Sequence, residues 1–240
     1  HALAKLREKR PGNLTPEELI ELEFLTGLSI DYESIVAEAY GNIPQAIPYV
    51  EQALRRLEKY PLDERVHLEK LCREELSDLY SYAEDRRAAG ELEKCLDLHR
   101  AWLAMDTRPD RPHRDTTEYP MQIYGKMVFL LDLIPREQLT EYYDRCMQLA
   151  RERNDLEEIY RTSARYYECM GDNLRAAAYV DSVLTHYAQT GKKADLGSIY
   201  MAQSHMYEKA GDYEKALKAV REGNEYRYHN RMDEAQRHLA

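Results

Sequence analysis

Two arginines in the C-terminal half of the chain have the type and spacing needed to bind a carboxylate. Arg161 and Arg165 are four residues apart, so they share one face of a helix. Two planar guanidinium groups in this arrangement can donate paired hydrogen bonds to the carboxylate of an acidic side chain or of a peptide C-terminus. The alternative is that both arginines form ion pairs along their own helix, with Glu157, Glu158 or Glu168.

The sequence carries no recognisable signature of catalysis. It has no GxxxxGK[ST] phosphate loop, no HExxH zinc motif and no GxSxG nucleophile turn. Neighbouring carboxylates such as Glu74 and Glu75 indicate solvated charge, because no pattern marks a pocket around them. The histidines are not grouped at the short helical spacing of a metal site. They include His67, His99, His113, His186 and His205. We therefore predict no enzyme activity, no metal and no cofactor.

The composition indicates a folded protein with an acidic surface. Of 240 residues, 43% are hydrophobic, and 44 acidic against 34 basic side chains give a net charge of −10. Such a charge disfavours nucleic-acid binding by this segment, since phosphates need a concentrated positive field. No run approaches the ~18 apolar residues of a membrane span. The four cysteines lie far apart without a CxxC pair, so we expect buried thiols and leave their pairing open.

Nearly the whole sequence predicts helix, and glycines and prolines separate the helices. No valine- or threonine-rich alternation indicates strands, so the predicted fold class is all-α. Turns near residues 41, 90, 134, 171 and 211 divide the chain into about five antiparallel hairpins. We expect N-terminal capping helices over 1–29, beginning a helix at Thr15-Pro16, then a helical repeat array over 30–230. Residues 231–240 are expected to be the truncated start of a further helix.

The last two predicted hairpins match one another at an offset of 40 residues. Aligned on their turn glycines, Gly171 and Gly211, they pair Tyr160 with Tyr200, Ala164 with Ser204, Tyr167 with Tyr207, Ala176 with Ala216 and Val180 with Val220. A repeat of this length is typical of a solenoid, in which each hairpin packs against its neighbours. Small residues allow two helices to approach closely, while tyrosines fill the groove between successive hairpins.

These residues resemble the tetratricopeptide repeat at its large, small, aromatic, turn and alanine positions. The fifth hairpin carries the pattern as Tyr200, Ser204, Tyr207, Gly211, Tyr213, Ala216, Val220 and Gly223. Departures are Ser163 and Gln203, where the family prefers leucine. In the second hairpin Gly90 is expected to form the turn and Cys95 stands at the alanine position, while Leu139 stands there in the third. The resemblance implies a right-handed superhelical solenoid of TPR-like hairpins.

The resemblance also implies a concave groove lined by the first helix of each hairpin. The residues that this register predicts to bind a peptide are Tyr80, Arg87, Tyr124, Arg161, Arg165, Met201 and His205. Glu84, Glu168 and Glu208 are expected to face the same groove. A cationic and partly apolar strip of this kind suits an extended peptide with an acidic group.

The implied function is a non-catalytic module that binds a protein or peptide segment. Long repeats and tyrosine-rich helices look most like the sensor or regulatory segments of bacterial signalling proteins such as histidine kinases, which carry an effector domain, in the cytoplasm or the periplasm. Because the chain begins with His1, we expect a trimmed segment. The alternatives are a structural scaffold or dimerisation adaptor, acting as a homodimer, and an enzyme without a recognisable motif.

One loop is a second candidate for recognition. The segment from Asp106 to Thr117 has two prolines and no aliphatic or aromatic residue, so it is expected to lie on the surface. It carries basic and acidic groups in nearly equal number. The alternative is a simple connector between the second and third hairpins.

Overall fold

A computed structural model describes residues 2–9, 13–36, 40–105, 116–130, 133–191 and 196–239. Every regular element in these ranges is a helix, as the sequence predicts. The chain divides into two compact units, an N-terminal unit of residues 1–138 and a C-terminal unit of residues 139–240. Most of the loop from Asp106 to Thr117 lies outside the described residues.

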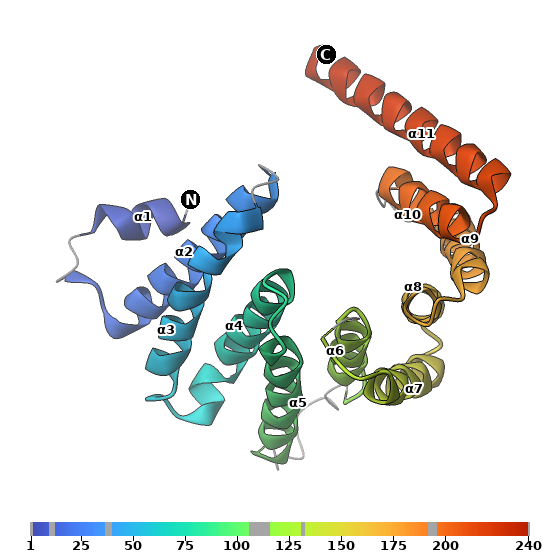
Figure 1. The fold of residues 1–240 in the computed structure, drawn as a ribbon. Helices are drawn as coiled ribbons and strands as arrows, with labels where there is room; N and C mark the ends of the chain where they lie inside the picture. Colours follow the sequence, from blue (N-terminus) through green and yellow to red (C-terminus); the bar gives the residue numbers. More distant parts are fainter. Residues whose placement is uncertain are drawn as a thin grey trace. The chain divides into compact units, whose positions relative to one another are not determined.

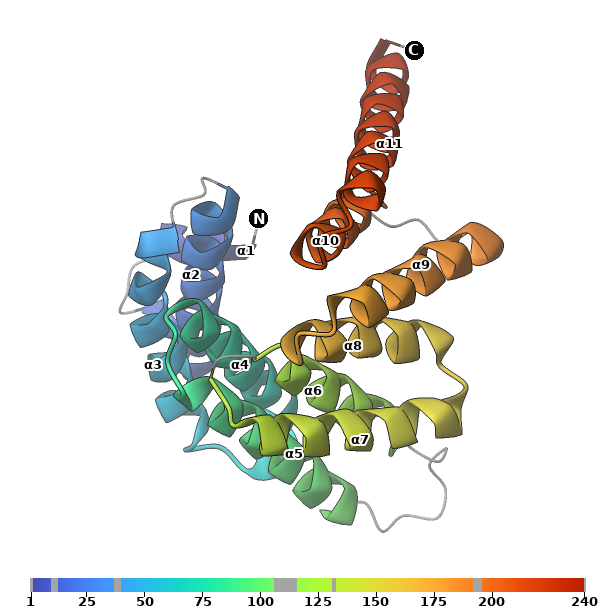
Figure 2. The ribbon, with the colours of Figure 1, turned by 45° about the vertical axis from the view of Figure 1, so that its right-hand side comes forward.

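The N-terminal unit is a stack of helical hairpins (Figure 1). Its described elements are α1 (Ala2–Glu8), α2 (Pro16–Val36), the 3-10 helix η2 (Tyr40–Gln45), α3 (Ile47–Leu57), α4 (Leu62–Tyr82), α5 (Arg87–Met105) and α6 (Glu118–Val128). Helix α2 packs against α3, and α4 lies beside α5 in both Figure 1 and Figure 2. The apolar stripe of α3 is buried, since Val50 and Ala53 are both 0% exposed.

The C-terminal unit is also built from helical hairpins. Its elements are α7 (Arg136–Arg153), which begins just before the unit, α8 (Leu156–Cys169), α9 (Asn173–Thr190), α10 (Leu196–Lys209) and α11 (Tyr213–Leu239). The pairs α8 with α9 and α10 with α11 are antiparallel neighbours (Figure 2). Residues 231–239 continue α11 without a break, so the prediction of a separate further helix there is wrong.

Helix α2 begins where the sequence predicts and runs past residue 29. The backbone N–H of Glu18 donates to Thr15 Oγ1 over 3.2 Å, and the Thr15 N–H donates to the Glu18 carboxylate over 3.2 Å, which is a capping box. Gly27 lies within α2, and its lack of a side chain lets α2 approach α3 closely. A Cβ at Gly27 would lie only 2.5 Å from Val50 Cγ2. The expected division between capping helices and array at residues 29 and 30 therefore falls inside one helix.

Three hairpin turns share one backbone design. The turn residue has a positive φ, 54° at Glu84, 81° at Gly171 and 78° at Gly211, and an aspartate follows it each time. That aspartate donates its N–H to the carbonyl of a tyrosine five residues earlier, over 2.8 to 2.9 Å, and its carboxylate accepts an N–H from the next helix. Such a turn satisfies backbone groups at the end of one helix and at the start of the next.

The second hairpin therefore turns at Glu84 and not at Gly90, which corrects the sequence prediction. Gly90 lies inside α5, where a Cβ would meet nothing within 4 Å. Counted from the turn residue, Ala89 takes the place of Ala176 and Ala216, and all three alanines are buried. Cys95 is thus not the alanine equivalent. The error arose because a glutamate, and not a glycine, adopts the left-handed conformation in this turn.

The core of the C-terminal unit lies where the repeat pattern places it. Ala176 and Ala216 are 0% and 7% exposed, and Ala164 packs into the same cluster. Gly223 allows α10 and α11 to approach, since a Cβ there would lie 3.1 Å from Tyr200 Cβ and 3.3 Å from the Gly197 carbonyl oxygen. Small residues at these positions set the distance between helices, as predicted.

Polar side chains occupy the two sites at which the tetratricopeptide pattern prefers leucine. Gln203 is 4% exposed and donates to Asp181 Oδ1 over 2.6 Å, and Ser163 is 1% exposed with its hydroxyl 3.0 Å from that of Tyr143. Both side chains are therefore buried with partners, which removes the cost of leaving a polar group unpaired. The four cysteines are buried and free, as expected for core thiols, and burial raises the pKa of Cys72 to about 12.

Candidate functional site

The exposed face of α8 carries the two arginines that the sequence singled out. Asp155 caps α8 by accepting the Glu158 N–H over 3.0 Å, which fixes where the helix begins. Arg161 is exposed, while the Arg165 side chain is 28% exposed and donates to Glu168 over 2.8 Å. The ion pair with Glu168, which was one of the two alternatives, is therefore present for Arg165. Arg161 remains the more accessible of the two guanidinium groups.

An ion pair joins α8 to α10 beside these arginines. Lys209 Nζ lies 3.4 Å from the Glu168 carboxylate, whose side chain is 14% exposed. Burial acts to raise the pKa of Glu168, but its hydrogen bond with Arg165 and the charges of Arg165 and Lys209 bring the pKa below its usual value. Glu168 is thus an anion held between two cations, and it competes with any incoming carboxylate for Arg165.

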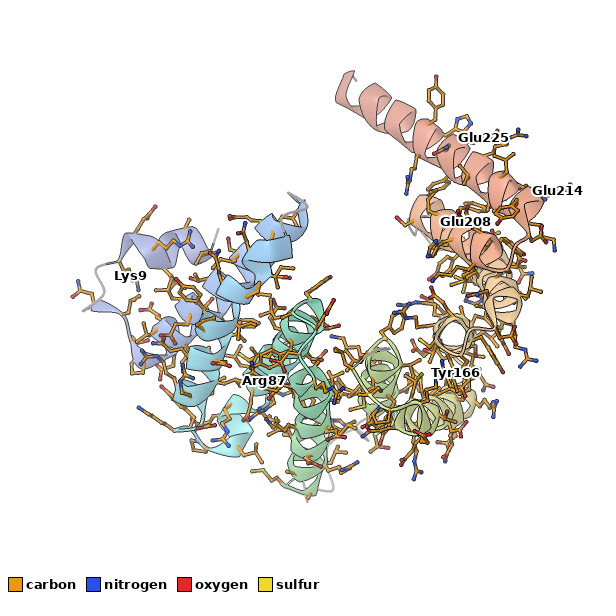
Figure 3. All side chains as sticks on the ribbon, in the orientation of Figure 1. Lys9, Arg87, Tyr166, Glu208, Glu214 and Glu225 are labelled. Carbon is orange, nitrogen blue, oxygen red and sulfur yellow. The ribbon has the colours of Figure 1, made fainter. Side chains whose placement is uncertain are left out.

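Met201 and His205 on α10 occupy the places that Arg161 and Arg165 occupy on α8. They lie 40 residues further along the chain, and 36% of Met201 and 58% of the His205 side chain are exposed. His205 Nδ1 is 3.9 Å from the Glu208 carboxylate, and Glu208, labelled in Figure 3, is itself exposed. These side chains and the two arginines form the surface that we call the α8–α10 face.

In the N-terminal unit the equivalent positions are acidic. Counted back from Glu84 as Arg161 and Arg165 are counted back from Gly171, the corresponding residues are Glu74 and Asp78 on α4. Lys126 of α6 lies 2.9 Å from Glu74 and 3.6 Å from Asp78. The two units therefore present opposite charge at the same repeat positions, which the uncorrected register could not reveal.

Tyr80 and Arg87 do not lie where the groove prediction put them. Tyr80 is 3% exposed and donates its hydroxyl to Glu51 over 2.7 Å, so its ring belongs to the core. Burial, and then the hydrogen bond to Glu51, raises the pKa of Tyr80. Arg87, which is labelled in Figure 3, lies in the first turn of α5, the second helix of its hairpin. There it pairs with Asp85 over 2.7 Å and stacks on the Tyr80 ring.

Two other residues predicted to face the groove, Tyr124 and Glu84, lie on a half-buried helix face and in a turn. Tyr124 is half-buried on α6, and Glu84 is the exposed residue at the left-handed position of the α4–α5 turn. Within the described ranges no group of three or more His, Cys, Asp or Glu side chains has an arrangement that could hold a metal ion, and no helix there is long and apolar enough to cross a membrane. The α8–α10 face is thus the part of the predicted groove at which exposed side chains gather on neighbouring helices.

Comparison with known proteins identifies the fold. No protein-family model and no curated protein matches the sequence. Among solved structures, a Rap protein complexed with Competence and Sporulation Factor is similar, with a TM-score of 0.67, 14% identity and 93% of this chain covered. The apo form of RapI has a TM-score of 0.56 at 15% identity, and BtubC from P. vanneervenii has 0.50 at 15%. This chain spans 57% and 58% of the two Rap chains.

The chain has the all-α, TPR-like helical-repeat fold that the sequence predicts. Repeat proteins of this kind present side chains from successive helices on one continuous surface. The likeness to the Rap structures extends over nearly all of this chain but only part of theirs, so it concerns the fold and not the whole function of those proteins.

Proposed function

We propose that this chain is a non-catalytic module that binds a protein or peptide segment, and that it serves as the sensor or regulatory part of a larger signalling protein. The observation that supports this most directly is the α8–α10 face, where Arg161 is exposed on α8 and Met201 and His205 are exposed at the equivalent repeat positions of α10. A face that offers a guanidinium group together with exposed apolar and imidazole side chains suits an extended segment that carries an acidic group.

The comparison with the Rap protein supports a binding role for this fold. That protein, which has the same fold over this chain's length, was crystallised with Competence and Sporulation Factor. Small shifts at each helix interface change the curvature of a repeat array, so an occupied face can affect an attached domain. No observation favours catalysis over this role, and the scaffold alternative predicts no ligand for the α8–α10 face.

The test is selection of peptides from a random-sequence display library on the wild-type chain. The selected peptides should be enriched in acidic side chains, and their affinity should fall at least tenfold for Arg161→Glu. The matched control is Arg151→Glu, which makes the same charge change at an exposed position on α7. Equal loss in both variants, or no loss in either, would move the binding surface away from α8 and α10.

A further inference from the structure

Three helices of the N-terminal unit bring four carboxyl groups and one amine together. Asp31 comes from α2, Glu74, Glu75 and Asp78 come from α4, and Lys126 comes from α6. Helix α2 contacts α4 directly. We call this set the α2–α4 carboxyl cluster. Like charges at such a contact repel, and the repulsion grows as water is excluded.

Part of this cluster is satisfied. Lys126 forms ion pairs with Glu74 at 2.9 Å and with Asp78 at 3.6 Å, and the Tyr119 hydroxyl donates to Glu74 over 3.0 Å. Asp78 also keeps 53% of its side chain exposed, so water solvates it. The single amine of the cluster is therefore engaged at its outer side, by Glu74 and Asp78.

Asp31 and Glu75 lack such partners. Asp31 Oδ1 and Glu75 Oε1 each expose less than 1 Å², and within the described part of the chain neither oxygen has a hydrogen-bond partner. Charged groups on α3 and α5, which also pack against α4, are engaged elsewhere. Glu51 of α3 accepts from Tyr80, and Glu91 of α5 pairs with two cations, Arg73 and Lys94.

A buried carboxyl oxygen without a donor is costly when the group is charged, and a proton removes that cost. A protonated carboxyl group is neutral, and its O–H can donate to a neighbouring carboxylate. Burial, followed by the charges of Asp31 and Asp78, raises the pKa of Glu75 to about 7, against the opposing effect of Lys126. Burial and the charge of Asp78 also raise the pKa of Asp31. The group that gains most from a proton is therefore Glu75.

We propose that the contact between α2 and α4 is a proton-dependent junction, which is tight while Glu75 carries a proton and loosens when that proton is released. The step is the simple loss of a proton from the Glu75 carboxyl group to water. Release adds a negative charge at a carboxyl group that has one buried oxygen without a donor and that already experiences the charge of Asp31. This inference does not depend on peptide binding at the α8–α10 face.

The sign of the pH effect follows from the direction of the shift. The pKa of Glu75 in the folded chain, about 7, lies above its ordinary value of 4.5. The folded chain therefore holds a proton that the unfolded chain has already lost between these two values. The junction is most stable below the ordinary value, and its stability falls as the pH rises through about 7.

The first measurement is an NMR titration of glutamate side-chain carboxyl carbons in the full chain. Glu75 should titrate near neutral pH, and the control Glu21→Gln, at an exposed position on α2, should leave the Glu75 midpoint unchanged. Asp31→Asn should move the Glu75 midpoint down, because it removes a neighbouring charge. A Glu75 midpoint in the usual glutamate range would overturn the proposal.

The second measurement is hydrogen exchange of the α2 amides, corrected for the intrinsic effect of pH. Between about pH 6 and pH 8, protection in α2 should fall about tenfold in the wild type, since the protonated fraction of Glu75 falls across this range. Glu75→Gln, which keeps a neutral side chain, should show no such fall, and the control Glu21→Gln should behave like the wild type. Should Glu75→Gln fail to fold, Asp31→Asn must weaken the response. A wild-type response that survives both variants would contradict the junction.

Discussion

The side-chain nitrogen of Lys70 lies 2.9 Å from Nδ1 of His99 inside the N-terminal unit, and both residues are buried. Lys70 Nζ also lies 4.0 Å from the centre of the Tyr119 ring. Because an ammonium group only donates, Nδ1 accepts from Lys70 and the neutral imidazole carries its proton on Nε2. Burial, and then the charge of Lys70, lowers the pKa of His99 to about 4.

Acid should therefore destabilise the N-terminal unit through His99. The folded pKa of about 4 lies below the ordinary value of 6.5, so the unfolded chain binds more protons between these values and stability falls as the pH falls. Glu75 acts in the opposite direction, so the useful quantity is the difference between the wild type and His99→Asn. From about pH 7 to pH 4 the wild type should lose about 1 to 3 kcal/mol more than the variant in urea denaturation. Parallel stability curves would show that His99 does not titrate in this window.

Replacing Glu84 by glycine should stabilise the chain. Glu84 is exposed and has a φ of 54°, a conformation that glycine adopts without the clash caused by a Cβ. The expected gain for Glu84→Gly is about 0.5 to 1 kcal/mol in the free energy of unfolding. Glu93→Gly is the matched control, because Glu93 is exposed within α5 and the same change there should cost about 1 kcal/mol. Equal losses in both variants would mean that Glu84 carries no backbone strain.

The sequence predicts the C-terminal unit better than the N-terminal unit for a local reason. Gly171 and Gly211 stand at the turn positions, so the residue type alone predicts both turns. The spacing from each glycine then predicts which alanines are buried. In the second hairpin the same turn is built on Glu84, whose residue type gives no sign of a left-handed conformation. A register counted from Gly90, which is a helical residue, places Tyr80 and Arg87 at groove positions of the first helix, whereas Tyr80 is buried and Arg87 lies on the second helix of the hairpin.

The carboxyl cluster could not be predicted for a different reason. Glu74 and Glu75 form a pair of the kind that is usual on solvated helix faces, so their sequence pattern predicts exposure to solvent. Their environment depends on Asp31 and Lys126, which come from helices distant in the sequence. No local spacing rule relates such residues, because the packing of α2 and α6 against α4 brings them together.

A larger side chain at Ala176 should destabilise the C-terminal unit. Ala176 is 0% exposed and packs in a cluster with Ala164 and Met206, so extra methyl groups have no room. Ala176→Leu should cost about 1 to 3 kcal/mol through overpacking. Ala178→Leu is the control on the same helix, since Ala178 is exposed and the change should alter stability by less than about 0.5 kcal/mol. Chemical denaturation of both variants gives the comparison, and similar values would show that the repeat register in α9 is wrong.

Removing the charge of Glu168 should strengthen peptide binding at the α8–α10 face. Glu168 accepts a hydrogen bond from Arg165 over 2.8 Å, so it occupies a donor that an acidic peptide needs. Glu168→Gln should leave Arg165 more available and raise the affinity for the selected acidic peptides several-fold. Loss of this partly exposed ion pair should cost only about 0.2 to 1 kcal/mol of stability.

The control for this change is Glu208→Gln, which alters the net charge equally at an exposed position on α10. Glu208 lies 3.9 Å from His205 on its own helix, whereas Glu168 pairs with Arg165 of α8. Titration calorimetry with one selected peptide should therefore show a larger gain for Glu168→Gln than for Glu208→Gln. Equal gains would indicate a general charge effect, and no gain for Glu168→Gln would indicate that Arg165 does not touch the peptide. A larger gain for Glu168→Gln than for Glu208→Gln is the result expected if Glu168 and the ligand compete for the same guanidinium group.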